Sequence, residues 1–269
     1  MVDGATLARR AGTSADRIVF LGHATVLIEL DGVRLLTDPV LRDRVAHLRR
    51  QVAPVKKSVL FDATGPDAVL ISHLHYDHLD LASLRLLGLD TPLLVPVGAG
   101  AWLESRGFTQ VTELRVGGET ANVGALGVSA VEARHDDRRR PGPAGLRAAA
   151  QGYVVKGRAR TVYFAGDTGL FGGMSALGPS LDVALLPVAG WGPTLGPGHM
   201  DPLDAARAAG LIRPRLAIPI HWGTLLPIGT AGRHRDRLGD PPRQFAEHVA
   251  SLAPGVEVRT LQPGEETAL

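Results

Sequence analysis

The stretch AVLISHLHYDHLD, residues 68–80, joins a short apolar run to a dense group of polar side chains. Residues 68–71 are all apolar, which is typical of a buried strand. Three histidines and two aspartates follow within residues 71–80. Unpaired polar side chains are costly inside a core, so functional groups of this kind collect where a strand ends and a loop begins. The stretch therefore predicts a functional site at the edge of a sheet.

The pattern His-x-His-x-Asp-His within this stretch predicts a metal site. His73, His75 and Asp77 alternate along the chain, so an extended segment would direct all three to one side. His78 would point elsewhere once the chain turns, and one short loop could then serve two metal ions. The chain has no cysteine, so a metal must be held by histidine and carboxylate, a ligand set that suits zinc.

Three further ligand-type residues stand where other apolar runs stop. His135 closes VSAVEARH (128–135), Asp167 closes TVYFAGD (161–167), and His221 follows RLAIPI (215–220). Each run has the composition of a strand. Together with the first stretch, four strands would direct ligand side chains to one edge. Four unrelated histidines and aspartates, each satisfied by local hydrogen bonds, explain this pattern poorly.

The rest of the chain alternates strand-like runs with helical patterns. Strands are also predicted at 17–22, 25–30, 33–38, 92–97, 152–157 and 182–188, and helices at 83–88, 201–210 and 243–252. The pair Asp31-Gly32 predicts an antiparallel hairpin. Asp201 and Pro202 predict a helix start, and Gly210 its end. No low-complexity linker divides the chain, so we expect one domain over residues 1–269, an α/β sandwich of mixed sheets covered by helices.

Composition excludes several classes of protein. With 45% hydrophobic and 21% charged residues, the chain has the composition of a soluble globular protein. No apolar stretch approaches the roughly 18–20 residues of a transmembrane segment, and the start lacks the apolar core of a signal peptide, so we expect a cytoplasmic location. The net charge of +2 is small and the basic residues are scattered, which argues against a nucleic-acid partner.

Six stretches carry a family resemblance. They are LGHATVLIEL, LLTDPV, AVLISHLHYDHLD, YFAGDTG, DVALLPV and IPIHWGT, and they extend from about residue 18 to residue 224. They resemble the metallo-β-lactamase fold superfamily, in particular the branch with L-ascorbate-6-phosphate lactonase and N-acylphosphatidylethanolamine-hydrolysing phospholipase D. The resemblance implies a four-layer αββα sandwich, with two mixed sheets flanked by helices and metals at one edge of the inner sheets.

The resemblance also implies a site for two divalent metal ions, with zinc as the first choice and manganese or iron as alternatives. His73, His75 and His135 would hold the first ion, Asp77, His78 and His221 the second, and Asp167 would bridge them. Two cations about 3.5–4 Å apart can share a hydroxide, because their combined charge brings the pKa of bound water near neutrality. We expect that hydroxide to be the nucleophile. Asp77 would also act as a catalytic group that accepts a proton or orients the water.

Other residues in or near these motifs receive more open assignments. His23 and Trp222 are assigned to substrate binding, with a structural hydrogen bond as the alternative for His23. His199 follows the glycine- and proline-rich loop GWGPTLGPG (190–198) and is assigned a catalytic role, contacting substrate or stabilising developing negative charge. Asp80 either orients a ligand histidine or caps the helix that starts near Leu81, and both assignments stay open.

The predicted function is hydrolysis of an ester-type bond, a phosphodiester or a lactone, in a small molecule. Arginines in RHDDRRRPGP (134–143) could contact an anionic substrate, and a solvated loop is the alternative. A mononuclear iron dioxygenase acting on a persulfide is a second interpretation, which needs only the first set of ligands. A metal-stabilised binding module without catalysis is the third. Homo-oligomer formation stays open, because no exposed apolar helix argues for it.

Overall fold

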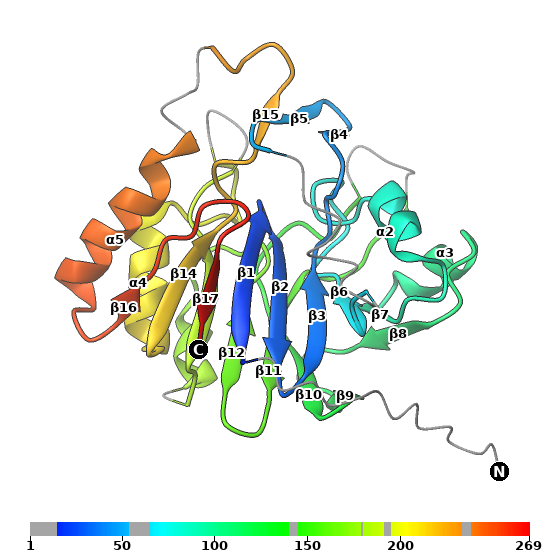
Figure 1. Ribbon diagram of the computed structural model, residues 1–269, viewed down its shortest axis with the longest axis horizontal. Coiled ribbons are helices and arrows are strands. Elements are labelled where there is room, and N and C mark those ends of the chain that lie inside the picture. The colour runs from blue at the N-terminus through cyan, green and yellow to red at the C-terminus, as the bar shows by residue number, and fades with distance from the viewer. Residues whose placement is uncertain (1–14, 54–64, 140–144, 179, 191–194, 233–237) are drawn as a thin grey trace.

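The structure is a computed structural model that describes residues 15–53, 65–139, 145–178, 180–190, 195–232 and 238–269. Two seven-stranded sheets form its centre (Figure 1). The first sheet has the order β17-β1-β2-β3-β6-β7-β8. Its strands are β1 (Arg17–Gly22), β2 (Thr25–Leu30), β3 (Val33–Thr37), β6 (Ala68–Leu70), β7 (Leu93–Pro96), β8 (Val111–Leu114) and β17 (Glu266–Ala268).

The second sheet has the order β16-β14-β13-β12-β11-β10-β9. Its strands are β9 (Ala121–Val123), β10 (Leu126–Glu132), β11 (Gln151–Lys156), β12 (Thr161–Phe164), β13 (Val183–Pro187), β14 (Leu216–Ile220) and β16 (Glu257–Val258). In both sheets one half is antiparallel and the other half is parallel. The mixed sheets predicted from the sequence are confirmed.

The turn between β2 and β3 has the geometry that its sequence predicts. Leu30 pairs with Val33, so two residues make the connection. Asp31 and Gly32 both have positive φ, 50° and 78°. A two-residue turn with positive φ at both positions matches the twist of the flanking strands, and Asp-Gly adopts it at low cost. The predicted hairpin is therefore confirmed.

Helices cover the outer face of each sheet. On β1, Ile18 and Phe20 pack into the core that includes the second sheet, while Val19 and Leu21 pack into the core that contains side chains of α2 (Leu81–Leu87) and α3 (Gly100–Glu104). This follows from the alternation of side chains along a strand. Helices α4 (Pro202–Ile212) and α5 (Asp240–Leu252) pack on the second sheet, on the opposite side of the molecule from α2 and α3 (Figure 1). The fold is a four-layer αββα sandwich, as the resemblance implies.

Helix α4 begins where the sequence predicts and ends later. Asp201 is its N-cap and accepts a hydrogen bond from the Asp204 amide at 2.8 Å, with Pro202 in the first turn. The predicted end at Gly210 is wrong, because the helix continues to Ile212 and closes at Arg213 in the left-handed conformation. Ile212 is 1% exposed, so its burial in the core favours the extension of the helix by two residues past Gly210.

A small third sheet lies beyond one end of the large sheets (Figure 1). It contains β4 (Arg44–Val45), β5 (Leu48–Arg50) and β15 (Leu225–Pro227) in the order β15-β5-β4. A short 3-10 helix (Gly172–Leu177) precedes β13. Among the described residues, every helix is too short or too polar to span a lipid bilayer.

Candidate metal centre

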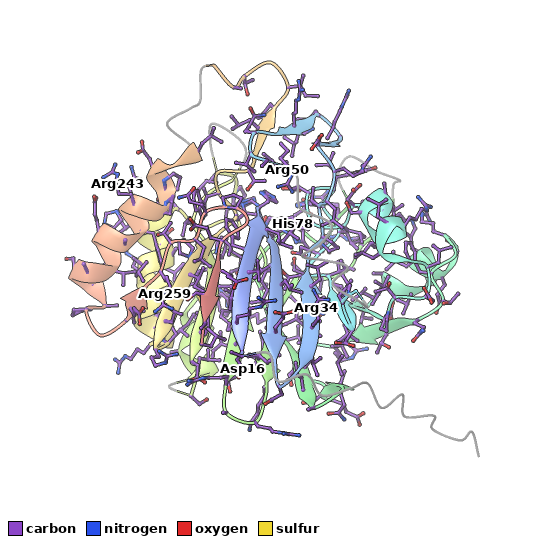
Figure 2. All side chains as sticks on the ribbon, in the orientation of Figure 1. Asp16, Arg34, Arg50, His78, Arg243 and Arg259 are labelled. Carbon is purple, nitrogen blue, oxygen red and sulfur yellow. The ribbon has the colours of Figure 1, made fainter. Side chains whose placement is uncertain are left out.

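The end of the sandwich next to the small sheet carries the candidate site. Figure 2 shows His78 at the upper end of the large sheets, below Arg50 of the small sheet. His73 follows β6, His135 follows β10, Asp167 follows β12 and His221 follows β14. The seven predicted ligands, together with His23 and His199, lie in four overlapping groups of side chains that could each hold a metal ion. The strand-end argument therefore located the cluster correctly.

The segment that carries His75, Asp77 and His78 is a turn, so the extended segment expected from the sequence is wrong. The His78 and Leu79 amides both donate to the carbonyl oxygen of His75, at 3.1 and 2.8 Å. Residues 76–78 form this turn. The turn places Asp77 and His78 in a different group of ligand atoms from His75, because the chain reverses instead of alternating.

One group of ligand atoms contains His73, His75 and His135. The Nε2 atoms of His73 and His135 each lie 3.0 Å from Nδ1 of His75. Tetrahedral zinc, with Zn–N bonds of about 2.0–2.1 Å, holds its nitrogen ligands about 3.3 Å apart. The spacing of the three nitrogens is therefore close to that of a metal-bound set.

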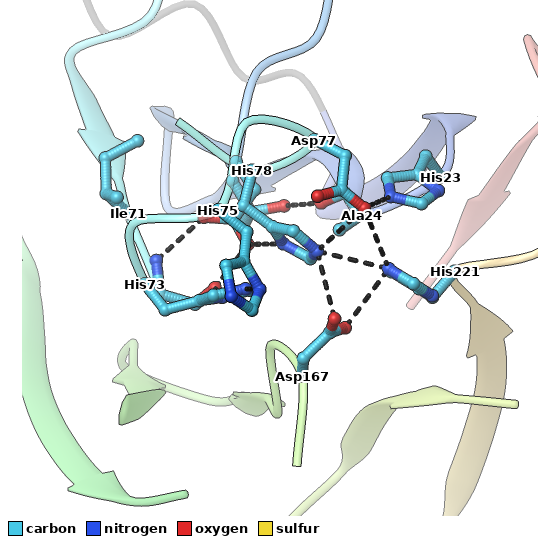
Figure 3. Close-up of polar contacts among 12 residues, drawn as sticks. His23, Ala24, Ile71, His73, His75, Asp77, His78, Asp167 and His221 are labelled. Carbon is cyan, nitrogen blue, oxygen red and sulfur yellow. Dashed lines mark hydrogen bonds and ion pairs between the residues drawn. The ribbon is translucent and has the colours of Figure 1, made fainter. Parts of the chain in front are cut away.

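A second group contains Asp77, His78 and His221, with His23 beside them. His78 Nε2 lies 3.1 Å from His221 Nε2, and Asp77 Oδ2 lies 3.8 and 3.7 Å from these two nitrogens. Figure 3 shows these side chains directed towards one another. The ligand atoms of the second group thus also converge, at somewhat longer distances than those of the first.

Asp167 lies between the two groups. Its Oδ2 is 3.2 Å from His78 Nε2 and 4.0 Å from His135 Nε2, while its Oδ1 is 3.3 Å from His221 Nε2 (Figure 3). The carboxylate is 2% exposed, and Oδ1 is buried without a hydrogen-bond partner among the described residues. A buried carboxylate oxygen with no donor is costly unless a cation is close to it. The position of Asp167 fits a ligand shared by two ions.

The ring nitrogens that face away from the cluster decide which nitrogens can bind a metal. Nδ1 of His135 donates to the carbonyl of Gly198, and Nδ1 of His221 donates to that of Ala189, both at 2.8 Å. A carbonyl only accepts, so Nδ1 carries the proton and Nε2 of the neutral ring presents its lone pair to the cluster. Nitrogen lone pairs that face one another at about 3 Å repel unless a cation lies between them, so these histidine nitrogens fit a bound metal ion.

Asp38 is a site residue that sequence reasoning did not select, although LLTDPV was among the quoted stretches. Asp38 Oδ2 accepts from Nδ1 of His78 at 2.7 Å and from Oγ of Ser72 at 2.5 Å, while Oδ1 accepts from the Ser72 amide at 2.7 Å. Oγ of Ser72 in turn accepts from Nδ1 of His73 at 2.9 Å. Asp38 is fully buried and fixes the tautomer of one histidine in each group.

Two buried carboxylates of the cluster, Asp77 and Asp167, stay ionised beside the histidines. Burial raises the pKa of Asp77, but the charge of His78 and the hydrogen bond from His23 outweigh burial and hold that pKa well below its usual value. Burial also opposes ionisation of Asp167, yet the charges of His221 and His78 hold its pKa well below the usual value. Burial lowers the pKa of His78, but Asp167, Asp77 and Asp38 outweigh it and raise that pKa well above its usual value. Three carboxylates around one imidazole suit a divalent cation.

Three other histidines of the cluster, His23, His73 and His135, are held neutral mainly by burial. Burial and the neighbouring His221 lower the pKa of His23 to about 3. Burial lowers the pKa of His135 to about 4, against the opposing effect of Asp167. Burial, His78 and His135 lower the pKa of His73 well below its usual value. A neutral imidazole is the form that binds metal, so these rings are ready ligands at neutral pH.

His23 lies behind the second group. Its Nε2 is 2.9 Å from Asp77 Oδ2, its ring centre is 3.9 Å from that of His221, and its side chain is 2% exposed. Because neutral His23 can donate its Nε2 proton to the Asp77 carboxylate, the ring orients a candidate ligand. This geometry corresponds to the structural hydrogen-bonding role left open for His23.

His199 lies at the outer side of the cluster. Its Nε2 is 3.4 Å from Asp167 Oδ2, its ring packs edge-on against His135, and its side chain is 23% exposed, whereas that of Asp167 is 2% exposed. Burial lowers the pKa of His199, but the hydrogen bond and charge of Asp167 raise it above the usual value. Residues 191–194 of the preceding loop lie outside the described residues.

Two other assigned residues lie away from the ligand atoms. Trp222 is 3% exposed, stacks on Phe20 and donates its indole N–H to the Pro219 carbonyl at 2.9 Å. The structure places Trp222 in the core instead of at a surface where it could contact a substrate. Asp80 accepts from the Ser83 amide at 3.1 Å as the N-cap of α2 and pairs with Arg42. These contacts correspond to the capping role left open for Asp80.

The arginines around His135 differ from one another: the exposed Arg134 and Arg138 fit the solvated alternative, and Arg139 does not. Arg134 pairs with Glu132, and Arg138 with Asp136. Arg139 points inward and is 4% exposed, so it lies neither in a solvated loop nor at a surface that a substrate can reach. Residues 140–143 of the stretch fall outside the described residues.

Comparisons with known proteins agree with this geometry. The family described as Beta-lactamase superfamily domain matches residues 33–222. A UPF0173 metal-dependent hydrolase from Methanopyrus kandleri is 35% identical over 252 residues, which cover 93% of this chain and 98% of the relative. An N-acyl-phosphatidylethanolamine-hydrolyzing phospholipase D from Caenorhabditis elegans is 33% identical over 246 residues, covering 81% of this chain and 67% of the relative.

A solved structure extends the likeness to three dimensions. A metallo hydrolase from the archaeon Ignicoccus hospitalis has a TM-score of 0.72 and 25% sequence identity, with 95% of this chain and 99% of that chain covered. The chain belongs to the metallo-β-lactamase fold superfamily. Within it, the protein is an enzyme, a metal-dependent hydrolase.

Proposed function

We propose that the protein is a dinuclear zinc hydrolase that cleaves an ester-type bond, a phosphodiester or a lactone, in a small molecule. The observation that carries the proposal is the convergence of histidine nitrogens from two groups on either side of one buried carboxylate, Asp167. A single ion would leave one of the two groups without a cation. Imidazole and carboxylate ligands without sulfur suit zinc, and manganese or iron are the alternatives.

Each group has a defined role in this proposal. His73, His75 and His135 would hold one ion, Asp77, His78 and His221 would hold the other, and Asp167 lies where it could serve both. Two cations so placed would bring the pKa of a water molecule near neutrality and polarise the oxygen that becomes negatively charged in the reaction. Asp38 and Ser72 keep the ligand lone pairs of His78 and His73 directed inward through the contacts described above.

Two residues act on the reacting groups. Asp77, held by His23, orients the attacking water or accepts its proton. His199 is partly exposed and faces Asp167, so it contacts the substrate from the open side and donates a hydrogen bond to the oxygen on which negative charge develops. This geometry supports the catalytic role assigned to His199 from the sequence.

The persulfide dioxygenase interpretation needs only the first group of ligands. The second group, with its own orienting residues His23 and Asp38, would then have no function. The likeness to a phospholipase D, an enzyme named for hydrolysis of a phospholipid, supports the phosphodiester over the lactone as the first substrate to test.

Metal analysis tests the proposal directly. Protein purified without added metal is measured by plasma mass spectrometry beside His78→Ala and His221→Ala, with His248→Ala in α5 as the matched control. We expect about two zinc ions per chain in the parent and the control, and close to one in the two site variants. Hydrolysis of bis-p-nitrophenyl phosphate and of simple lactones is then assayed with the same four proteins. One iron per chain, unchanged in the site variants, would refute the dinuclear hydrolase.

A further inference from the structure

A buried arginine lies directly behind the turn that carries three of the proposed ligands. Arg139 is 4% exposed, and its Nη1 donates to the carbonyl of Leu74 at 2.7 Å and to the carbonyl of Leu79 at 3.2 Å. These two residues bracket the turn with His75, Asp77 and His78. One nitrogen of the guanidinium group therefore ties together both ends of the ligand turn.

The carbonyls of Leu74 and Leu79 require the hydrogen bond from Arg139, because they are buried. Leu74 and Leu79 are fully buried, and the backbone hydrogen bonds within the turn end on the carbonyl of His75. Buried backbone carbonyls without a donor are rare, because they lose their hydrogen bonds to water on folding and form no others in exchange. An apolar side chain at position 139 would fill the space but leave both carbonyls without this donor.

Aromatic rings hold the guanidinium group in place. Its central carbon lies 4.1 Å from the ring centre of Tyr76, a residue of the same turn, and 4.8 Å from that of Trp102 in α3. Such contacts stabilise a cation that has lost its water. Tyr76 also packs on the apolar cluster of the small sheet, so Arg139 is enclosed between the small sheet and α3.

The backbone of Arg139 links the two groups of ligands. It lies four residues after His135, and its amide donates to the carbonyl of Leu146. The segment that supplies one ligand of the first group thus also fixes the turn that supplies His75 to that group and Asp77 and His78 to the second. A shift of this segment would move ligands of both groups together.

We propose that Arg139 is a positioning residue for the metal centre, which sets the conformation of the ligand turn and thereby the affinity for metal. The inference rests on the proposed function, because it assumes that the turn binds metal. The turn supplies one ligand to the first group and two to the second, so the loss of Arg139 weakens the second group more. Loss of an outer hydrogen-bonding partner of metal ligands typically lowers affinity about 10- to 100-fold.

Zinc affinity measured on the folded enzyme tests the proposal. Zinc-loaded parent protein, Arg139→Met, Arg139→Gln and Arg139→Lys are each equilibrated with graded concentrations of a chromophoric chelator, and zinc release is followed by absorbance. Arg106→Met is the matched control, because Arg106 also stacks on Trp102, at 3.8 Å, and donates to the Trp102 carbonyl instead of the turn. Circular dichroism and thermal unfolding report folding, and the absorption spectrum of the cobalt-loaded proteins reports ligand geometry.

We expect Arg139→Met and Arg139→Gln to release one of two zinc ions at a chelator concentration about 10- to 100-fold lower than the parent, with an altered cobalt spectrum. Arg139→Gln keeps an amide donor but is too short to span both carbonyls. It provides the test if the methionine variant does not fold. Arg139→Lys keeps charge and donors and should recover part of the affinity, while Arg106→Met should match the parent. Folded Met or Gln variants that hold both ions as tightly as the parent overturn the inference alone. A parent protein that holds no zinc overturns the proposed function together with it.

Discussion

Replacement of Asp38 by asparagine is the most discriminating test of how the site is preorganised. The substitution keeps the shape of the side chain and changes one acceptor into a donor. Oδ2 of Asp38 accepts from His78 and from Ser72 Oγ, and Oδ1 accepts from the Ser72 amide. If the amide nitrogen takes the Oδ2 position, it faces Nδ1 of His78. If it takes the Oδ1 position, it faces the Ser72 N–H, so either orientation sets a donor against a donor.

The magnitude follows from these contacts. A donor without an acceptor inside a fully buried site costs about 1–3 kcal/mol. His78 avoids the conflict by moving its proton from Nδ1 to Nε2, and this tautomer presents no lone pair to the metal. Metal binding must then reverse the tautomer, so zinc affinity falls by the same free energy. This is about 5- to 150-fold at about 1.4 kcal/mol for each factor of ten, in the range seen for outer partners of metal ligands.

The assay is competition for zinc between the protein and a chelator, with the unfolding free energy measured in urea on the metal-free form. Asp182→Asn is the matched control, because Asp182 also accepts from a backbone amide, that of Thr161 at 2.8 Å, at the opposite ends of the strands from the site. We expect Asp38→Asn to bind zinc more weakly than the parent and Asp182→Asn to bind zinc as tightly as the parent. Zinc affinity of Asp38→Asn equal to that of the parent would show that Asp38 does not set the tautomer of His78, and the reasoning would fail.

Four further outcomes are expected. Removal of metal by a chelator should lower the Tm, because free metal at 1,000 times its Kd stabilises the folded protein by about 4 kcal/mol. Differential scanning calorimetry with and without added zinc measures the difference. His23→Ala should fold and lose kcat for the phosphodiester, since Asp77 Oδ2 loses its contact with Nε2 of His23, and an unchanged kcat would argue against this orienting role. Gly22→Ala should cost about 1–3 kcal/mol in urea unfolding, because φ is 109° and the added Cβ would lie 2.8 Å from Thr224 Oγ1. Asp201→Ala should cost about 1 kcal/mol by the same measurement through loss of the N-cap of α4, without an effect on zinc content.

The features that the sequence predicted correctly depend on local rules. Strand ends are marked by the change from apolar to polar residues, and the ends of parallel strands meet at one edge, so Asp167 and His221 of the second sheet come together without knowledge of the strand order. His73 lies in the first sheet and joins them through the packing of the two sheets. The Asp31-Gly32 hairpin and the cap at Asp201 follow from backbone preferences of single residues. The four-layer arrangement came from the resemblance, because alternation alone does not say which sheet faces which.

The features that were missed depend on contacts between distant segments. Asp38 reaches His78, 40 residues later, only because β3 and β6 are parallel neighbours with Thr37 opposite Leu70. Arg139 reaches the turn of residues 74–79 because its own segment folds back under the site. A sequence shows Arg139 as one of several arginines in a charged run, and it gives no sign that this one is buried. Strand register and the return path of a loop follow from packing across the whole domain.

Backbone strain shows where the site depends on those distant contacts. His23, Asp38 and His221 have positive φ, 56°, 34° and 63°, a region that residues with a Cβ seldom adopt. Each is fixed by a hydrogen bond from another segment: the His221 amide donates to the His23 carbonyl, the His23 amide to Thr224 Oγ1, and the Asp38 amide to the Leu70 carbonyl. Such conformations cost about 1–3 kcal/mol each and persist only where the surroundings hold them. The rest of the fold therefore stabilises the site in the geometry that the ligands require. Arg50 of the small sheet and Thr224, immediately before strand β15 of that sheet, both contact the β1–β2 turn and are part of that support.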